Sequence, residues 1–82
     1  MAHVILVYDI TSDKIRAKVA DTCLDYGLDR IQFSAFSGQL SRNHQRELMR
    51  RLHALIGDNS CRVTLLPICD ADWQNRLEIE HA

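Results

Sequence analysis

The 82-residue chain has only three cysteines and three glycines, the residue types of zinc clusters and of phosphate-binding loops. Its three cysteines are odd in number and far apart, and none has a cysteine or histidine partner at zinc-finger spacing. We therefore expect Cys23, Cys61 and Cys69 to be small buried side chains. The three glycines stand alone, which excludes a glycine-rich phosphate loop.

Long hydrophobic runs are also lacking. No apolar stretch approaches the roughly 18 residues that cross a bilayer, and no basic segment followed by a small-residue cleavage site begins the chain. We expect a protein of the cytoplasm that does not contact a membrane. The four histidines are scattered, without metal-ligand spacing or a neighbouring nucleophile, and we interpret them as surface or hydrogen-bonded side chains.

A strong charge of one sign is missing as well. The net charge of −1 argues against a protein that binds nucleic acid with its whole surface. However, nearly all positive charges lie between Lys14 and Arg51, whereas acidic residues dominate the last dozen positions. This distribution leaves room for a local basic face.

The length indicates one domain, residues 1–82, at the lower end of the sizes that fold alone. Such a chain buries only roughly 60% of the surface exposed when unfolded, so association with a second copy would add useful buried area. The hydrophobic pattern and the cap residues predict the elements. The first elements are a strand at His3–Tyr8, which Asp9 stops, and a helix from Thr11–Asp13 to about Tyr26. Asp29–Leu40 forms either one kinked strand or two short ones, with a bulge or bend near Phe36 and Gly38. A helix at Ser41–Ile56, a last buried strand at Cys61–Ile68 and a short candidate strand at Leu77–Ile79 follow.

Helices that alternate with strands in so short a chain predict an α/β (α+β) sandwich with two helices on one face of a sheet. The order β-α-β-β-α-β, followed by a short C-terminal strand or tail element, is typical of the ferredoxin-like fold.

Asp9 is the first charged residue after the buried strand, where α/β folds often place ligand-binding groups. A carboxylate there can hold a hard cation such as Mg2+. From the pattern alone, the better interpretation is that Asp9 ends the strand and caps the turn into the first helix.

Two sets of basic residues repeat at helical spacing. Lys14 and Lys18 are four residues apart on the first predicted helix, with Arg16 between them. On the second helix, the arginines that repeat every four residues are Arg42, Arg46 and Arg50. Like charges at this spacing destabilise an isolated helix modestly, so a polyanionic partner would explain the second row. An ordinary solvent-exposed basic face is an equal alternative.

Two segments together resemble a known family. Val7-Tyr8-Asp9-Ile10 ends the first strand, and Gly27-Leu28-Asp29-Arg30-Ile31-Gln32-Phe33-Ser34-Ala35-Phe36 follows one helix later. This arrangement resembles the CRISPR-associated protein two family, over about residues 4–68. The family supplies the small dimeric partner of the spacer integrase in prokaryotic adaptive immunity. The chain departs from it at Ser37, where many members carry a glutamate.

The resemblance implies roles for several residues. Asp9 would lie near the two-fold axis of a homodimer, so that the pair of carboxylates shares a metal ion, Mg2+, with Tyr8 beside it as a further catalytic candidate. Arg16, Lys18 and Arg30 would contact phosphates, and Phe36 matches the family pattern. A tail strand that crosses to the partner subunit makes Trp73, Leu77 and Ile79 candidates for a dimer contact, although Trp73 could instead cover the end of its own sheet.

Three functions follow as alternatives. The first is a homodimer that bridges CRISPR integrase subunits and binds double-stranded DNA by its backbone during spacer acquisition. The second is a metal-dependent endonuclease, on RNA or double-stranded DNA, that uses Asp9 from both chains. Because one acid per chain is too little for hydrolysis, catalysis is left open. The third, a ferredoxin-like sensor of small molecules, would need a polar pocket that the sequence does not reveal.

Overall fold

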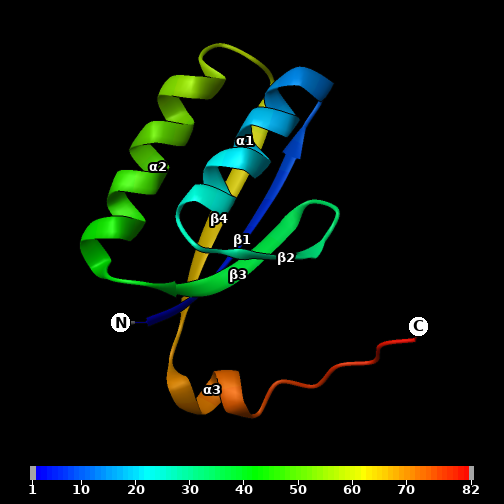
Figure 1. Ribbon diagram of the computed structural model, residues 1–82, viewed down its shortest axis with the longest axis vertical. Helices are drawn as coiled ribbons and strands as arrows, with labels where there is room; N and C mark the ends of the chain where they lie inside the picture. The colour runs from blue at the N-terminus through cyan, green and yellow to red at the C-terminus, as the bar shows by residue number, and fades with distance from the viewer. Residues whose placement is uncertain (1, 82) are drawn as a thin grey trace.

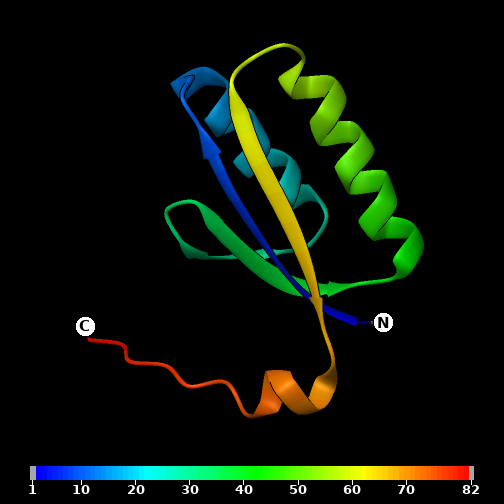
Figure 2. The ribbon, with the colours of Figure 1, turned by 180° about the vertical axis from the view of Figure 1, so that it is seen from behind.

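A four-stranded antiparallel sheet carries two helices on one face in the computed structural model, which describes residues 2–81 (Figures 1 and 2). The strand order is β2-β3-β1-β4, the predicted ferredoxin-like arrangement. The elements are β1 (Ala2–Ile10), α1 (Asp13–Asp25), β2 (Asp29–Gln32), β3 (Ala35–Leu40), α2 (Arg42–Ile56), β4 (Cys61–Ile68) and α3 (Asp70–Gln74).

Strand β1 lies at the centre of the sheet and alternates between its two faces. Val4, Leu6, Tyr8 and Ile10 point to the helices and are at most 5% exposed. Their neighbours point to the face without helices, here called the open face. Because β1 pairs with β4 up to Ile10, Asp9 lies within the strand and does not end it as predicted.

Local sequence signals begin and end the two long helices. The Ser12 hydroxyl accepts a hydrogen bond from the Ile15 amide at 3.2 Å, and Ser41 caps α2 in the same way. Gly27 follows the Tyr26 C-cap with a φ of 80°, a left-handed conformation that glycine adopts without steric cost. Helix α1 ends at Asp25, one residue before the predicted end.

The core lies between the helices and the sheet. Its largest fully buried side chain is Phe36 of β3, which packs in one cluster with the buried stripes of α1 and α2. The buried side of α1 includes Val19 and Cys23, and that of α2 includes Leu48, Leu52 and Ile56. Ile15, Tyr26 and Leu55 pack at the edge of the cluster.

The segment Asp29–Leu40 forms a hairpin of two short strands. Phe33 and Ser34 make the turn, and the irregular pairing lies between Arg30 and Gln32 on β2. The predicted bulge near Phe36 and Gly38 is confirmed beside Phe36, which pairs with Arg30, although the extra residue belongs to β2; at Gly38 the pairing is regular. Position 38 requires glycine for packing, because a Cβ there would lie 2.7 Å from Leu28 Cδ2.

Three further predictions are corrected at the second half of the chain. Strand β4 is a half-exposed edge strand, not a buried one, because only β1 pairs with it. Consequently Cys61 is exposed, and so is Cys69 beyond the strand; only Cys23 is buried. The helix α3 follows β4, and Leu77–Ile79 form no strand in the described chain. Among residues 2–81, no helix is long and apolar enough to span a membrane.

Candidate nucleic-acid interface and carboxylate site

Asp9 projects from the open face near the end of β1. It is exposed and stands opposite Arg62 in the register with β4. Thr11, Ser60 and Cys61 complete a shallow hollow around these two residues. The Thr11 hydroxyl donates to the Ser60 carbonyl at 3.3 Å, which ties the end of β1 to the start of β4. The strand pairing thus positions the carboxylate on an accessible surface.

One chain does not supply a metal site around this carboxylate. Within residues 2–81, no group of three or more histidine, cysteine, aspartate or glutamate side chains could hold an ion. Mg2+ prefers oxygen ligands and usually keeps several waters beside one or two carboxylates. Asp9 alone would be one such carboxylate, and a second would have to come from another molecule.

Tyr8 lies on the other side of the sheet from Asp9. Its ring is 5% exposed and stacks on Phe36, with ring centroids 6.2 Å apart. The buried hydroxyl has no hydrogen-bond partner in the described part of the chain. The two residues predicted as catalytic are therefore not brought together within one chain, because successive residues of a strand face opposite ways.

Two of the predicted phosphate-binding arginines meet at the β2–β3 turn. The guanidinium carbon of Arg16 lies 5.4 Å from the centre of the Phe33 ring, and that of Arg30 lies 6.0 Å from it. Arg16 is held in place, since it donates to the Ile10 carbonyl at 2.9 Å and pairs with Asp13. Arg30 also lies over the buried ring of Phe36, at 5.1 Å.

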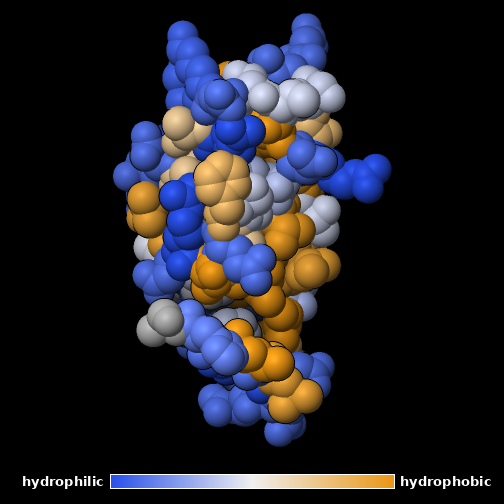
Figure 3. All heavy atoms as spheres, turned by 90° about the vertical axis from the view of Figure 1, so that its right-hand side faces the viewer, coloured by the Kyte–Doolittle hydropathy of each residue, from blue (hydrophilic) through white to orange (hydrophobic). Residues whose placement is uncertain are grey.

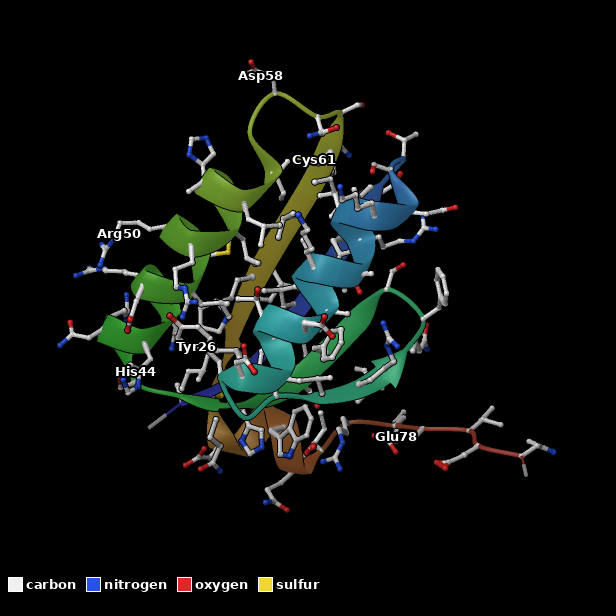
Figure 4. All side chains as sticks on the ribbon, turned by 45° about the horizontal axis from the view of Figure 1, so that its top comes forward. Tyr26, His44, Arg50, Asp58, Cys61 and Glu78 are labelled. Carbon is white, nitrogen blue, oxygen red and sulfur yellow. The ribbon has the colours of Figure 1, made fainter. Side chains whose placement is uncertain are left out.

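The remaining basic candidates are spread over the helices. Lys14 and Lys18 are exposed on α1. Arg42, Arg46 and Arg50 are all exposed on α2. Figure 4 shows Arg50 projecting from α2 away from α1, so this row and the Arg16–Arg30 cluster lie on different sides of the helix layer.

Trp73 covers the end of its own sheet. Its indole ring stacks on His3 of β1, with ring centroids 4.1 Å apart. The guanidinium carbon of Arg76, which follows α3, lies 4.1 Å from the centre of the indole. Beyond this stack, Leu77 and Ile79 are 96% and 89% exposed. In Figure 3 hydrophobic side chains extend along one side of the molecule toward this tail.

Phe33 lies at the turn between β2 and β3, a position that the sequence pattern does not indicate. The imperfect alternation of residues 29–40 indicates that Phe33 shares one face with Ile31 and Ala35, but it is 70% exposed at the turn. No local signal in the sequence marks residues 33 and 34 as a two-residue hairpin turn, and the closeness of Phe33 to Arg16 and Arg30 is apparent only in the fold.

Comparisons with known proteins agree with this architecture. The family described as "CRISPR associated protein Cas2" matches residues 1–76. A relative from Chloroflexus aurantiacus, named CRISPR-associated endoribonuclease Cas2 2, is 43% identical over 93% of this chain and 89% of its own length.

Two further proteins are similar. The crystal structure of Streptococcus pyogenes Cas2 superimposes with a TM-score of 0.79 and 25% identity, covering 96% of this chain and 99% of that one. A Thermoproteus tenax protein named CRISPR-associated endonuclease Cas1/endonuclease Cas2 fusion is 51% identical over 71% of this chain, which spans 22% of its length. The sheet order, the paired sequence segments and these matches show that the chain belongs to the CRISPR-associated Cas2 family.

Proposed function

We propose that two copies of this chain form a dimer that binds double-stranded DNA and bridges integrase subunits during CRISPR spacer acquisition. The observation that carries the proposal is the separation of the two faces. The basic candidates lie on the helix layer or at its edge, whereas Asp9 and several exposed apolar residues lie on the open face. The fusion of Cas1 with Cas2 in the Thermoproteus tenax relative supports an integrase partner.

The open face supports association with a second copy. Ile5 and Val7 of β1 lie beside Leu66 and Thr64 of β4, and Val7 and Leu66 are 38% and 47% exposed. A second copy would remove this apolar surface from water. Trp73, Leu77 and Ile79 would extend the contact at the tail. A two-fold axis that passes close to the end of β1 would bring the Asp9 carboxylates of both copies toward each other.

The helix layer supports contact with a DNA backbone. Arg42, Arg46 and Arg50 form a row on α2 without an acidic partner among the described residues. Lys14, Lys18 and Arg16 add positive charge on α1, with Arg30 at the adjoining hairpin. Contacts to phosphates position a duplex without reading its sequence, which suits a protein that handles DNA of any sequence.

Substitution of the α2 row tests DNA binding. Neutralising three phosphate contacts should reduce the slope of log K against log salt by about 2.7, at 0.9 per contact on B-DNA. We expect this decrease for Arg42, Arg46 and Arg50 changed to glutamine, measured by fluorescence anisotropy with a blunt duplex. The single change Arg76→Gln is the control for a lost exposed arginine, because Arg76 pairs with Glu78 at 2.7 Å far from α2. An unchanged slope for the triple variant would contradict the basic-row proposal.

The dimer has its own test. Leu66→Asp places a charge on the exposed apolar part of β4 and should produce monomers in sedimentation experiments. Leu24→Asp is a matched control on α1, because Leu24 is 54% exposed on the helix layer. A wild-type chain that sediments as a monomer would refute the dimer.

A metal-dependent nuclease is the second candidate, because the Chloroflexus relative is named an endoribonuclease and Asp9 is accessible. Two Asp9 carboxylates would hold Mg2+, which supplies charge stabilisation and activated water when bound. We expect Asp9→Asn to abolish Mg2+-dependent cleavage and weaken Mn2+ binding while the dimer persists. Asp72→Asn, at the opposite end of the sheet, should change neither. If Asp9→Asn still supports spacer acquisition, cleavage is not the biological task.

A further inference from the structure

We infer that Phe33, together with Arg16 and Arg30, forms a binding site for an unpaired nucleobase. The inference deepens the proposed contact with DNA by adding a site for single-stranded ends or distorted positions, which the backbone contacts of the α2 row do not provide. It rests on the geometry of the β2–β3 turn.

The aromatic ring of Phe33 is exposed on a constrained turn. Phe33 is 70% exposed, although a phenylalanine is usually buried. The turn that presents it is anchored, because the Tyr8 amide of the central strand donates to the Ser34 carbonyl at 3.1 Å. A ring held on a fixed backbone can receive a base with little loss of conformational freedom.

Two arginines, Arg16 and Arg30, lie beside the Phe33 ring. Their guanidinium carbons lie 5.4 and 6.0 Å from its centre. Arg16 is oriented by the Ile10 carbonyl and by Asp13, so its planar group is prepared for stacking. Single-stranded nucleic acids are bound by this combination of aromatic rings, on which bases stack, and arginines that stack or contact the flanking phosphates.

Phe33, Arg16 and Arg30 line one hollow whose charges balance. It measures about 320 Å³, and its charged lining residues are Arg16, Arg30, Asp13 and Asp21. Two positive and two negative side chains leave no net charge. A neutral planar group such as a base therefore fits this hollow better than a phosphate, while the arginines at its rim remain available to the phosphates on either side.

A comparison of blunt and tailed duplexes tests the inference. The dimeric protein is titrated with a short blunt duplex and with the same duplex carrying unpaired 3′ tails that contain 2-aminopurine. We expect tighter binding of the tailed duplex and quenching of 2-aminopurine by stacking. Phe33→Ala should reduce the affinity for the tailed duplex about fivefold or more, since one stacked base contributes at least that factor, and should remove the quenching. Binding of the blunt duplex and its salt slope should not change.

Two matched variants separate stacking from loss of an exposed apolar side chain. Phe33→Tyr keeps a ring and should retain both the quenching and the preference for tails. Leu24→Ala removes an exposed apolar side chain elsewhere, on α1, and should leave all readouts unchanged.

The contrary results are distinct. Equal binding of tailed and blunt duplexes by the wild type, or an unchanged preference in Phe33→Ala, overturns the base site while leaving the backbone contacts intact. If Phe33→Ala instead weakens only the binding of the integrase, the turn is a protein contact and the inference is wrong. Loss of blunt-duplex binding by the wild type would refute the proposed function, and quenching in the tails would still report on the base site alone.

Discussion

Replacing Tyr8 with phenylalanine should stabilise the fold. The Tyr8 hydroxyl is buried, and no hydrogen-bond partner lies near it among residues 2–81. A buried hydroxyl without a partner costs about 1–3 kcal/mol in mutational data. Because the missing oxygen also leaves a small void, we expect Tyr8→Phe to raise the free energy of unfolding by about 1 kcal/mol, the lower end of that range. The stacking of the ring on Phe36 is retained.

Thermal unfolding followed by circular dichroism measures this change. In a domain of this size, 1 kcal/mol raises Tm by about 4–8 °C, provided that the wild type and the variant are compared at the same protein concentration. Tyr26→Phe is the matched control. Its hydroxyl accepts a long, exposed hydrogen bond from Arg51 at 3.5 Å, so the stability should change by less than about 0.5 kcal/mol.

The opposite sign would refute the reasoning. A decrease in stability of Tyr8→Phe by about 1 kcal/mol, the usual worth of a hydrogen bond, would mean that the hydroxyl has a partner in solution. The same variant also tests the role implied by the family resemblance. If Tyr8→Phe folds and forms dimers but loses metal-dependent cleavage that the wild type shows, the hydroxyl takes part in the reaction despite its buried position.

Two further predictions concern other parts of the core. Gly38→Ala should destabilise the fold by about 1–3 kcal/mol, as overpacking does, because the new methyl group would lie 2.7 Å from Leu28 Cδ2 and 3.3 Å from its Cα; urea unfolding measures the loss, and an unchanged midpoint would contradict it. Burial raises the pKa of the Cys23 thiol to about 11, against a nearby Arg30 that lowers it, so Cys23 should stay protonated and unreactive toward a thiol reagent near pH 8 while Cys61 and Cys69 react. Since the folded protein keeps this proton above the ordinary pKa of 9.0, stability should fall as pH rises from about 9 to 11, and rapid labelling of all three thiols in the folded state would refute the assignment.

The elements were predictable where the signal is local. The two long helices were predicted from cap residues and from the hydrophobic pattern, signals that act within a few residues, and both helices are confirmed. Period-two alternation could also have separated Tyr8 from Asp9, because neighbouring residues of one strand face opposite sides of the sheet.

The features that were missed depend on distant parts of the chain. Cys61 is exposed because β4 has only one neighbouring strand, a fact of sheet order that no local pattern contains. Trp73 forms its stack only because β4 carries α3 to the start of β1, next to His3. The exposure of Phe33 follows from a two-residue turn whose place was hidden by continuous alternation across β2 and β3. The surroundings of the candidate site residues could therefore not be predicted without the tertiary structure.

The central position of β1 makes its length intolerant of insertion or deletion. Its side chains alternate with period two, so one extra residue before Tyr8 would turn the remainder of the strand over. The carboxylate of Asp9 would then enter the packed layer beneath the helices, and the tyrosine ring would emerge on the opposite surface. A point substitution on this strand affects one face of the sheet, whereas a shift of its register by one residue would disturb both faces.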